Sequence, residues 1–257
     1  MPKYGFLVVE GPHDVEFTYR LLSPFGFQRI QFEADLDNFL KPLIPRSYPP
    51  DGDLQKRMNT PLFLRNLTHI VAVRSAIGDS RLVDTVEENM SKCDAAAFAG
   101  IGLLLDSDKL VPAAERYATV KAGLAAKGFA LPDQPGAIAP GAPRLGAYVL
   151  PDNQIPGTLE DLLIESAQAA YPDLLHHATT YVDASSEDDT LEADDLADFR
   201  KPAGRIKAIV GAIASVLRPG KAVQVSIQDN RWLRGGTLAI PRIKAVQDFL
   251  AALLELA

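Results

Sequence analysis

The sequence has almost no cysteine: Cys93 is the single cysteine among 257 residues. One thiol cannot form an internal disulfide, and without a cysteine cluster there is no thiolate zinc site. No apolar run approaches the roughly 20 residues that cross a bilayer, and the segment Met1–Tyr4 lacks the layout of a signal peptide. We therefore expect a cytoplasmic protein in a reducing compartment, with no membrane partner.

Basic residues are fewer than acidic ones, with 26 Lys and Arg against 33 Asp and Glu, so the formal net charge is −7 at pH 7. This balance counts against a broad basic surface for nucleic acid, although metal ions can screen substrate phosphates locally. The sequence contains no G-x-x-x-x-G-K-[ST] stretch, so it does not hydrolyse ATP through a P-loop. If ATP hydrolysis is involved, it comes from a separate ATPase partner.

What the sequence does contain is an alternation of strand-like and helix-like segments. Apolar runs typical of buried strands lie at residues 5–9, 70–73, 101–105 and 147–150, and a further strand is expected at 30–32. Segments with helical spacing of apolar residues separate most of them. This order predicts an α/β fold with a largely parallel sheet and helices on both faces. The proline-rich segment Pro42–Pro61 is expected to be a surface loop.

We expect a single domain over residues 1–257, with a core at about 4–184. An acidic linker and a C-terminal helical extension follow at about 185–257. The last helix carries an apolar face between Ile243 and Leu254, which we expect to be buried on the core or on a second subunit of a homo-oligomer.

Acidic residues directly follow three of the predicted strands. Glu10, Asp106 and Asp152 each stand where a strand ends, and the carboxyl ends of parallel strands are where such sheets bind ligands. Asp106 and Asp108 together can share one hard cation, Mg²⁺ or Mn²⁺. Asp152 is equally compatible with a turn. Asp14 would lie in the first turn of a helix, where its charge also has a purely structural use.

Four other features are candidates for a site. Thr158 and Asp161 form a capping-box pattern, which leaves Glu160 free to join a second metal ion. His13, beside Glu10, is a candidate substrate contact. The cluster Arg231-Trp232-Leu233-Arg234 could contact a nucleic-acid backbone, stack a base or simply pack. The pair His176-His177 lacks an acid at metal-ligand spacing.

Taken in order, these motifs resemble the TOPRIM domain. The resemblance rests on Val8-Val9-Glu10-Gly11-Pro12-His13-Asp14, followed by Leu104-Leu105-Asp106-Ser107-Asp108, and covers roughly residues 4–184. The later segment Gly157–Asp161 resembles stand-alone bacterial TOPRIM-like proteins. TOPRIM domains occur in topoisomerases, bacterial primases, recombination-repair proteins and overcoming-lysogenization-defect (OLD) family nucleases, and the resemblance implies a TOPRIM or Rossmann-like fold.

The resemblance also implies roles for individual residues. Glu10 matches the family's glutamate, a candidate general acid or base, and Asp106 and Asp108 match its metal-binding aspartates. Asp14 matches an acid carried by some nuclease members, and Glu160 matches the late carboxylate of two-metal nucleases. The chain departs from the pattern at Val111, where many members have glycine, which weakens the match to topoisomerases most.

Divalent-metal-dependent phosphodiester chemistry on DNA or RNA, as in a nuclease, is therefore the leading hypothesis. The chain has no room for the further domains of a topoisomerase and lacks the zinc-binding cysteines of a primase. A catalytically degenerate TOPRIM-like binding or regulatory module is the main alternative. A haloacid-dehalogenase-like phosphatase would use Asp106 as nucleophile, but the residues Lys109-Leu110-Val111 do not suit that family.

Overall fold

A computed structural model describes residues 2–47, 52, 54 and 58–257. The strands are β1 (Lys3–Val9), β2 (Gln28–Arg29), β3 (Leu62–Arg65), β4 (His69–Ser75), β5 (Phe98–Asp106), β6 (Ile138–Ala139) and β7 (Arg144–Leu150). The α-helices are α1 (Pro12–Leu22), α2 (Leu82–Met90), α3 (Ala113–Ala126), α4 (Leu159–Ala170), α5 (Pro172–Ser186), α6 (Gly204–Leu217), α7 (Val223–Asp229) and α8 (Pro241–Leu254).

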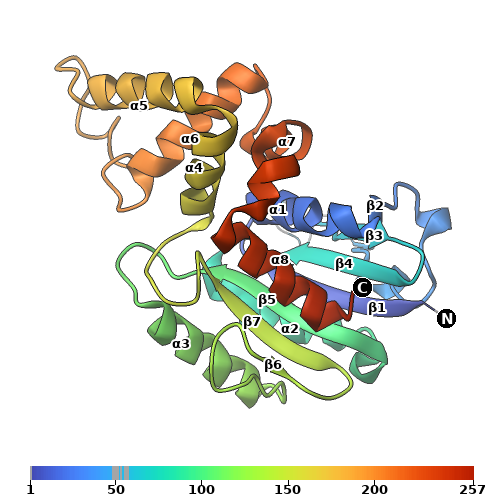
Figure 1. Ribbon diagram of the computed structural model, residues 1–257. Helices are drawn as coiled ribbons and strands as arrows, with labels where there is room; N and C mark the ends of the chain where they lie inside the picture. The colour runs from blue at the N-terminus through green and yellow to red at the C-terminus, as the bar shows by residue number, and fades with distance from the viewer. Residues whose placement is uncertain (1, 48–51, 53, 55–57) are drawn as a thin grey trace.

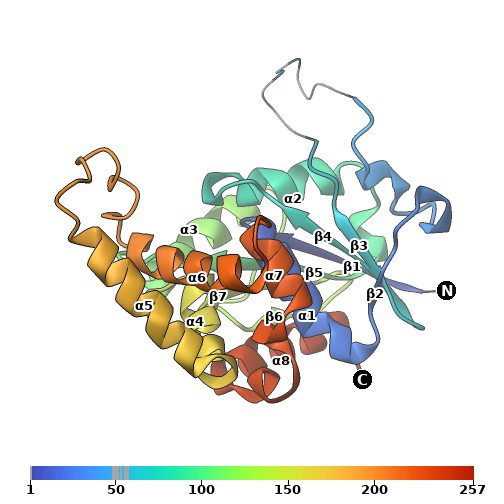
Figure 2. The same cartoon turned by 90° about the horizontal axis from the view of Figure 1, so that it is seen from above.

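The strands form one sheet in the order β2-β3-β4-β1-β5-β7-β6. The four central strands, β4, β1, β5 and β7, are parallel, and the short outer strands pair antiparallel at both edges. Helices α1 and α8 cover one face, while α2 and α3 cover the other (Figures 1 and 2). The predicted α/β fold with a largely parallel sheet and C-terminal helices is therefore confirmed.

Burial on both faces explains the continuous apolar run of β1. Phe6 and Val8 pack with the side chains of α2 and α3, whereas Leu7 and Val9 pack with those of α1 and α8. Because neighbouring residues of a strand point to opposite faces, a central strand between two helical layers has no polar face. The predicted strands at 5–9, 70–73, 101–105 and 147–150 all lie within observed strands.

The expected strand at 30–32 was wrong. The edge strand is Gln28–Arg29, which pairs with β3 over two residues, and the Phe32 side chain is 63% exposed. Phe32 therefore belongs to a surface segment, whereas Ile30 is partly buried against the core without being part of a strand. The segment Pro42–Pro61, predicted as a surface loop, lies in part outside the described residues.

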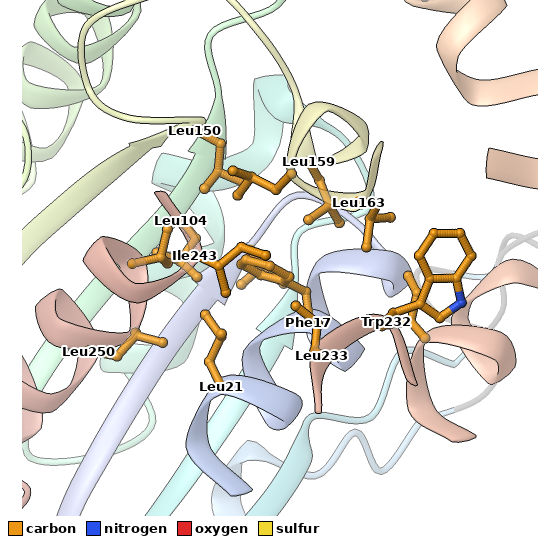
Figure 3. Packing of buried hydrophobic residues seen from close by; sticks show 14 of the residues in the cluster. Phe17, Leu21, Leu104, Leu150, Leu159, Leu163, Trp232, Leu233, Ile243 and Leu250 are labelled. Carbon is orange, nitrogen blue, oxygen red and sulfur yellow. The ribbon is translucent and has the colours of Figure 1, made fainter. Parts of the chain in front are cut away.

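Helix α8 lies close against the sheet, and its apolar face is buried there as its spacing predicts. Gly102 of β5 makes this approach possible, since a Cβ at that position would stand 2.3 Å from Leu253 Cδ2. Figure 3 shows Ile243 and Leu250 of α8 packed with Leu104 and Leu21 in the same cluster. Within the described part of the chain, no helix has the length and apolar character needed to span a bilayer.

Candidate functional site

The adjacent parallel strands β1 and β5 bring Glu10 and Asp106 together. Val9 pairs with Leu104, so both strands end at the same edge of the sheet. The backbone N–H of Asp106 donates a hydrogen bond to Glu10 Oε1 at 3.0 Å. The order of the strands therefore juxtaposes two acids that are 96 residues apart in sequence.

Two helix N-termini add further acids at this edge. Asp14 stands in the first turn of α1, 7% exposed, and its Oδ2 accepts a hydrogen bond from the Gly11 N–H at 2.9 Å. Asp106 Oδ1 accepts a hydrogen bond from the Leu159 N–H at 2.9 Å, which ties the aspartate to the start of α4. The next residue, Glu160, is 6% exposed. Carboxylates are stabilised at helix N-termini by the backbone N–H groups and the helix dipole.

These acids surround a pocket of about 250 Å³, which we call the carboxylate pocket. It is lined by Glu10, Gly11, Pro12, His13, Asp14, Gly78, Asp106, Leu159, Glu160 and Lys207. Four carboxylate side chains, from two strand ends and two helix starts, thus share one small space. Such crowding of like charges opposes ionisation unless a cation enters.

The pKa values of three of these carboxyl groups are raised. Burial is the main cause in each case, and it raises the pKa of Asp14 to about 7, with a further contribution from the charge of Glu10. The pKa of Asp106 is raised by burial and by the charges of Asp14 and Glu10. The pKa of Glu10 is raised by burial, although the nearby Arg116 lowers it in part.

The site also contains two basic residues, and the sequence analysis indicated neither of them. Arg116 of α3 donates from Nη2 to Glu10 Oε1 at 3.3 Å and from Nε to the carbonyl oxygen of Asp106 at 3.3 Å. Lys207 of α6 lines the pocket. Arg116 stands in the first turn of α3, the helix that follows the aspartate pair, and this position could have marked it as a candidate. Lys207 lies about 100 residues beyond the aspartate pair, and no local pattern indicates it.

The remaining predicted residues are distributed unevenly. His13 lines the pocket, and its pKa is lowered mainly by burial. Asp108 is not among the lining residues; it has a φ of +65° and forms a β-bridge with Gly157, but its charge still raises the pKa of Glu10. Asp152 makes a turn, because its Oδ1 accepts hydrogen bonds from Gln154 N and Ile155 N at 3.0 Å. Its other oxygen pairs with a guanidinium on α8.

The basic-aromatic cluster does not offer a stacking ring. Trp232 is fully buried, and its indole N–H donates to Ser226 Oγ at 2.8 Å. Arg231 and Arg234 donate to the carbonyl oxygens of Ala170 and Gln228, both at 3.2 Å, and neither lines the carboxylate pocket. Of the alternatives that the sequence left open, base stacking by Trp232 is contradicted by its burial. The cluster packs α4 against α7 and the turn that follows it.

The donor set suits a hard divalent cation. Asp14 Oδ1 is buried and has no hydrogen-bond partner, so it is a polar atom that a cation or its water would satisfy. Among the described residues, no group of three or more His, Cys, Asp or Glu side chains is arranged to hold a metal ion directly. Magnesium commonly binds through one or two carboxylates and keeps several waters. Asp14, Asp106 and Glu160 are the residues that would hold such a cation, partly through water.

In EDTA, without bound metal, the stability of the protein should depend on pH through Asp14. The pKa of Asp14 lies near 7 in the folded protein, above its ordinary value of 3.8. The folded state therefore keeps a proton that the unfolded chain releases, and stability falls as pH rises from about 4 to about 7. We expect Asp14→Asn to raise Tm at pH 8 by roughly 10 °C, while changing it little at pH 4. Thermal melts at both pH values measure this, and an equal shift at both would contradict the cause.

Fold and site together define an α/β protein with a carboxylate pocket at the carboxyl ends of its parallel strands. The chain belongs to the family described as "Protein of unknown function (DUF3226)", whose model matches residues 4–255. No match was found among curated proteins. The crystal structure of hypothetical protein PH0156 from Pyrococcus horikoshii OT3 is similar at 13% sequence identity, with a TM-score of 0.49 over 99% of this chain and 96% of that one.

Proposed function

We propose that the protein catalyses divalent-metal-dependent hydrolysis of phosphodiester bonds in nucleic acid. The observation that carries the proposal is the convergence of Glu10, Asp14, Asp106 and Glu160 on one pocket of about 250 Å³. Burying four carboxylates together is costly without compensating charge. Sites that cleave phosphodiesters use such acids, because bound cations offset the negative charge of substrate and transition state.

The residues of the pocket have separate tasks in this proposal. Asp14, Asp106 and Glu160 hold the cation, which when bound supplies charge stabilisation and a more acidic water. Glu10 has a raised pKa and stands at the pocket wall, so it holds or releases a proton as general acid or base. Lys207 offers its ammonium group to a phosphate oxygen at the mouth of the pocket.

Arg116 serves as a positioning residue. Its guanidinium contacts both the Glu10 carboxylate and the main chain of Asp106, and it is only 14% exposed. It therefore fixes the two strand ends relative to each other and limits the repulsion at Glu10. In the cytoplasm, where we place the protein, Mg²⁺ would be the resident cation.

The experiment that tests the function measures cleavage and metal binding in parallel. Labelled single- and double-stranded DNA and RNA are incubated with Mg²⁺, with Mn²⁺ and with EDTA. We expect cleavage with the metals only, and an increase in Tm on metal addition that is larger at pH 8 than at pH 6, since more carboxylates are then ionised. Cleavage that persists in EDTA would rule out the mechanism.

One specific feature favours a second function, that of a binding or regulatory module without turnover. The Arg116 guanidinium already pairs with Glu10 at 3.3 Å. Its positive charge therefore takes part of the role that a metal ion beside Glu10 would have. In that case metal or nucleic acid binds, but no strand is cut. A metal-dependent rise in Tm without cleavage of any of the four substrates would select this function over the nuclease.

A further inference from the structure

A second and larger pocket lies beside the carboxylate pocket, among the helices beyond the carboxyl ends of the central strands. It has a volume of about 650 Å³, is open to solvent, and is lined by α4, α5, α6 and the loop after β5. Figures 1 and 2 both show these three helices together at one end of the molecule. We call it the helical pocket; its lining residues are Lys109, Ile164, Gln168, Pro172, Leu175, His176, Thr179, Pro202, Arg205, Ile206 and Ile209.

The composition of the helical pocket resembles that of a small-ligand site. Ile164, Leu175 and Ile209 supply an apolar wall, while Gln168 and Thr179 supply hydrogen-bonding groups. Ligand pockets commonly combine an apolar lining with a few polar groups within about 300–1,000 Å³. A nucleobase needs this combination: flat apolar surface for its faces and an amide or hydroxyl for its edge.

The ionisable side chains that line the helical pocket are all basic. Among the described residues that line it, the ionisable side chains are Lys109, His176 and Arg205, in a protein whose net charge is −7. Arg205 already pairs with Asp183 through Nε and Nη2 at 2.7 and 2.8 Å, and Lys109 pairs with Asp161. Each cation retains further N–H donors, so each can also bind a phosphate oxygen.

Helices α4 and α6 carry lining residues of both pockets, and this arrangement indicates the kind of ligand that the helical pocket takes. Glu160, Ile164 and Gln168 follow one another at four-residue intervals on α4, so one stripe of the helix runs from one pocket to the other. Eight residues of α-helix span about 12 Å. On α6, Lys207 faces the carboxylate pocket while Ile206 and Ile209 line the helical pocket. Lys109 lines the helical pocket and pairs with Asp161 in the first turn of α4, next to Glu160 of the carboxylate pocket.

We propose that the helical pocket binds one nucleotide of a nucleic-acid strand, next to the phosphodiester held at the carboxylate pocket. The base packs between Ile164 and Ile209, within reach of Gln168 and the His176 ring, and the adjoining phosphate lies against Lys109. This inference rests on the proposed function for its choice of ligand. It explains how an acidic protein holds a polyanion: the contact is local and partly apolar rather than a broad basic surface.

The test measures binding without cleavage. Fluorescein-labelled ten-nucleotide single-stranded DNA and RNA are titrated with the full-length protein in EDTA, and fluorescence anisotropy gives Kd. Thr179→Trp fills the pocket from α5, and its matched control is Thr180→Trp, because Thr180 is exposed and does not line the pocket. We expect Thr179→Trp to raise Kd at least tenfold and Thr180→Trp to change it less than twofold.

A second pair of variants guards against misfolding. Gln168→Trp fills the pocket from α4, and the exposed neighbour Ala169→Trp is its control. Thermal melts show whether each variant folds. Photo-crosslinking of strands that carry 5-iodouridine, followed by peptide mass spectrometry, should label the His176 peptide of α5. Equal Kd values within both pairs, crosslinks confined to other peptides, or no binding of any strand by the wild type would each overturn the proposal.

The outcomes separate this inference from the proposed function. Binding that depends on the helical pocket, together with no cleavage under any metal, supports the pocket and removes the nuclease activity. Metal-dependent cleavage of bis(p-nitrophenyl) phosphate, a small diester without a base, together with equal Kd values for Thr179→Trp and Thr180→Trp, supports the activity and removes the nucleotide pocket.

Discussion

Asp106→Asn is expected to abolish Mg²⁺-dependent cleavage while leaving the metal-free protein at least as stable as the wild type. The asparagine carbonyl can still accept the 2.9 Å hydrogen bond from the Leu159 N–H, so the start of α4 keeps its anchor. Its neutral amide removes one of the charges that repel Asp14 and Glu10. We expect cleavage to fall by roughly 10³-fold, about 4 kcal/mol in transition-state stabilisation, because the cation loses a ligand.

Asp152→Asn is the matched control. Asp152 also follows a central parallel strand, but it makes a turn and pairs with Arg242 outside the carboxylate pocket. Its substitution should leave cleavage within twofold of the wild type. The two variants and the wild type are compared by gel assay with Mg²⁺ and by thermal melts in EDTA. Full cleavage by purified Asp106→Asn, or an equal loss in both variants, would contradict the role of Asp106.

The part of the site that could be predicted is the part that local sequence encodes. An acid directly after a buried apolar strand must lie at the carboxyl end of that strand, and adjacent parallel strands then place Glu10 and Asp106 side by side. The positions of Asp14 and Glu160 could be predicted in a similar way, because acids in the first turn of a helix stand at helix N-termini that face the sheet edge.

The part that could not be predicted depends on the packing of distant helices. Lys207 reaches the carboxylate pocket only because α6 packs on α4 and α5, and its own segment carries no sign of this. For Trp232 the sequence left base stacking and packing open. The structure decides for packing, because Ser226 supplies the hydrogen bond that allows the indole to be buried. Edge strands β2 and β6 were missed because two residues are too few for a pattern.

The C-terminal helix provides the prediction with the largest expected effect on stability. Leu253 of α8 is fully buried against the sheet, where a Cβ on Gly102 or a side chain on Gly100 would collide with it. Leu253→Asp should lower the free energy of unfolding by about 4 kcal/mol or more, since it removes buried apolar surface and places a carboxylate within an apolar cluster. Chemical denaturation followed by circular dichroism measures this loss.

The neighbouring residue separates burial from a mere loss of helix propensity. Ala252 is exposed on the same turn of α8, so Ala252→Asp introduces the same side chain at the same end of the same helix without entering the core. We expect it to change the free energy of unfolding by less than about 1 kcal/mol. If both variants lose the same stability, α8 does not pack on the sheet through Leu253. If only Leu253→Asp loses stability, α8 is part of the core and supports the sheet from the first half of β5, where Gly100 and Gly102 face Leu253.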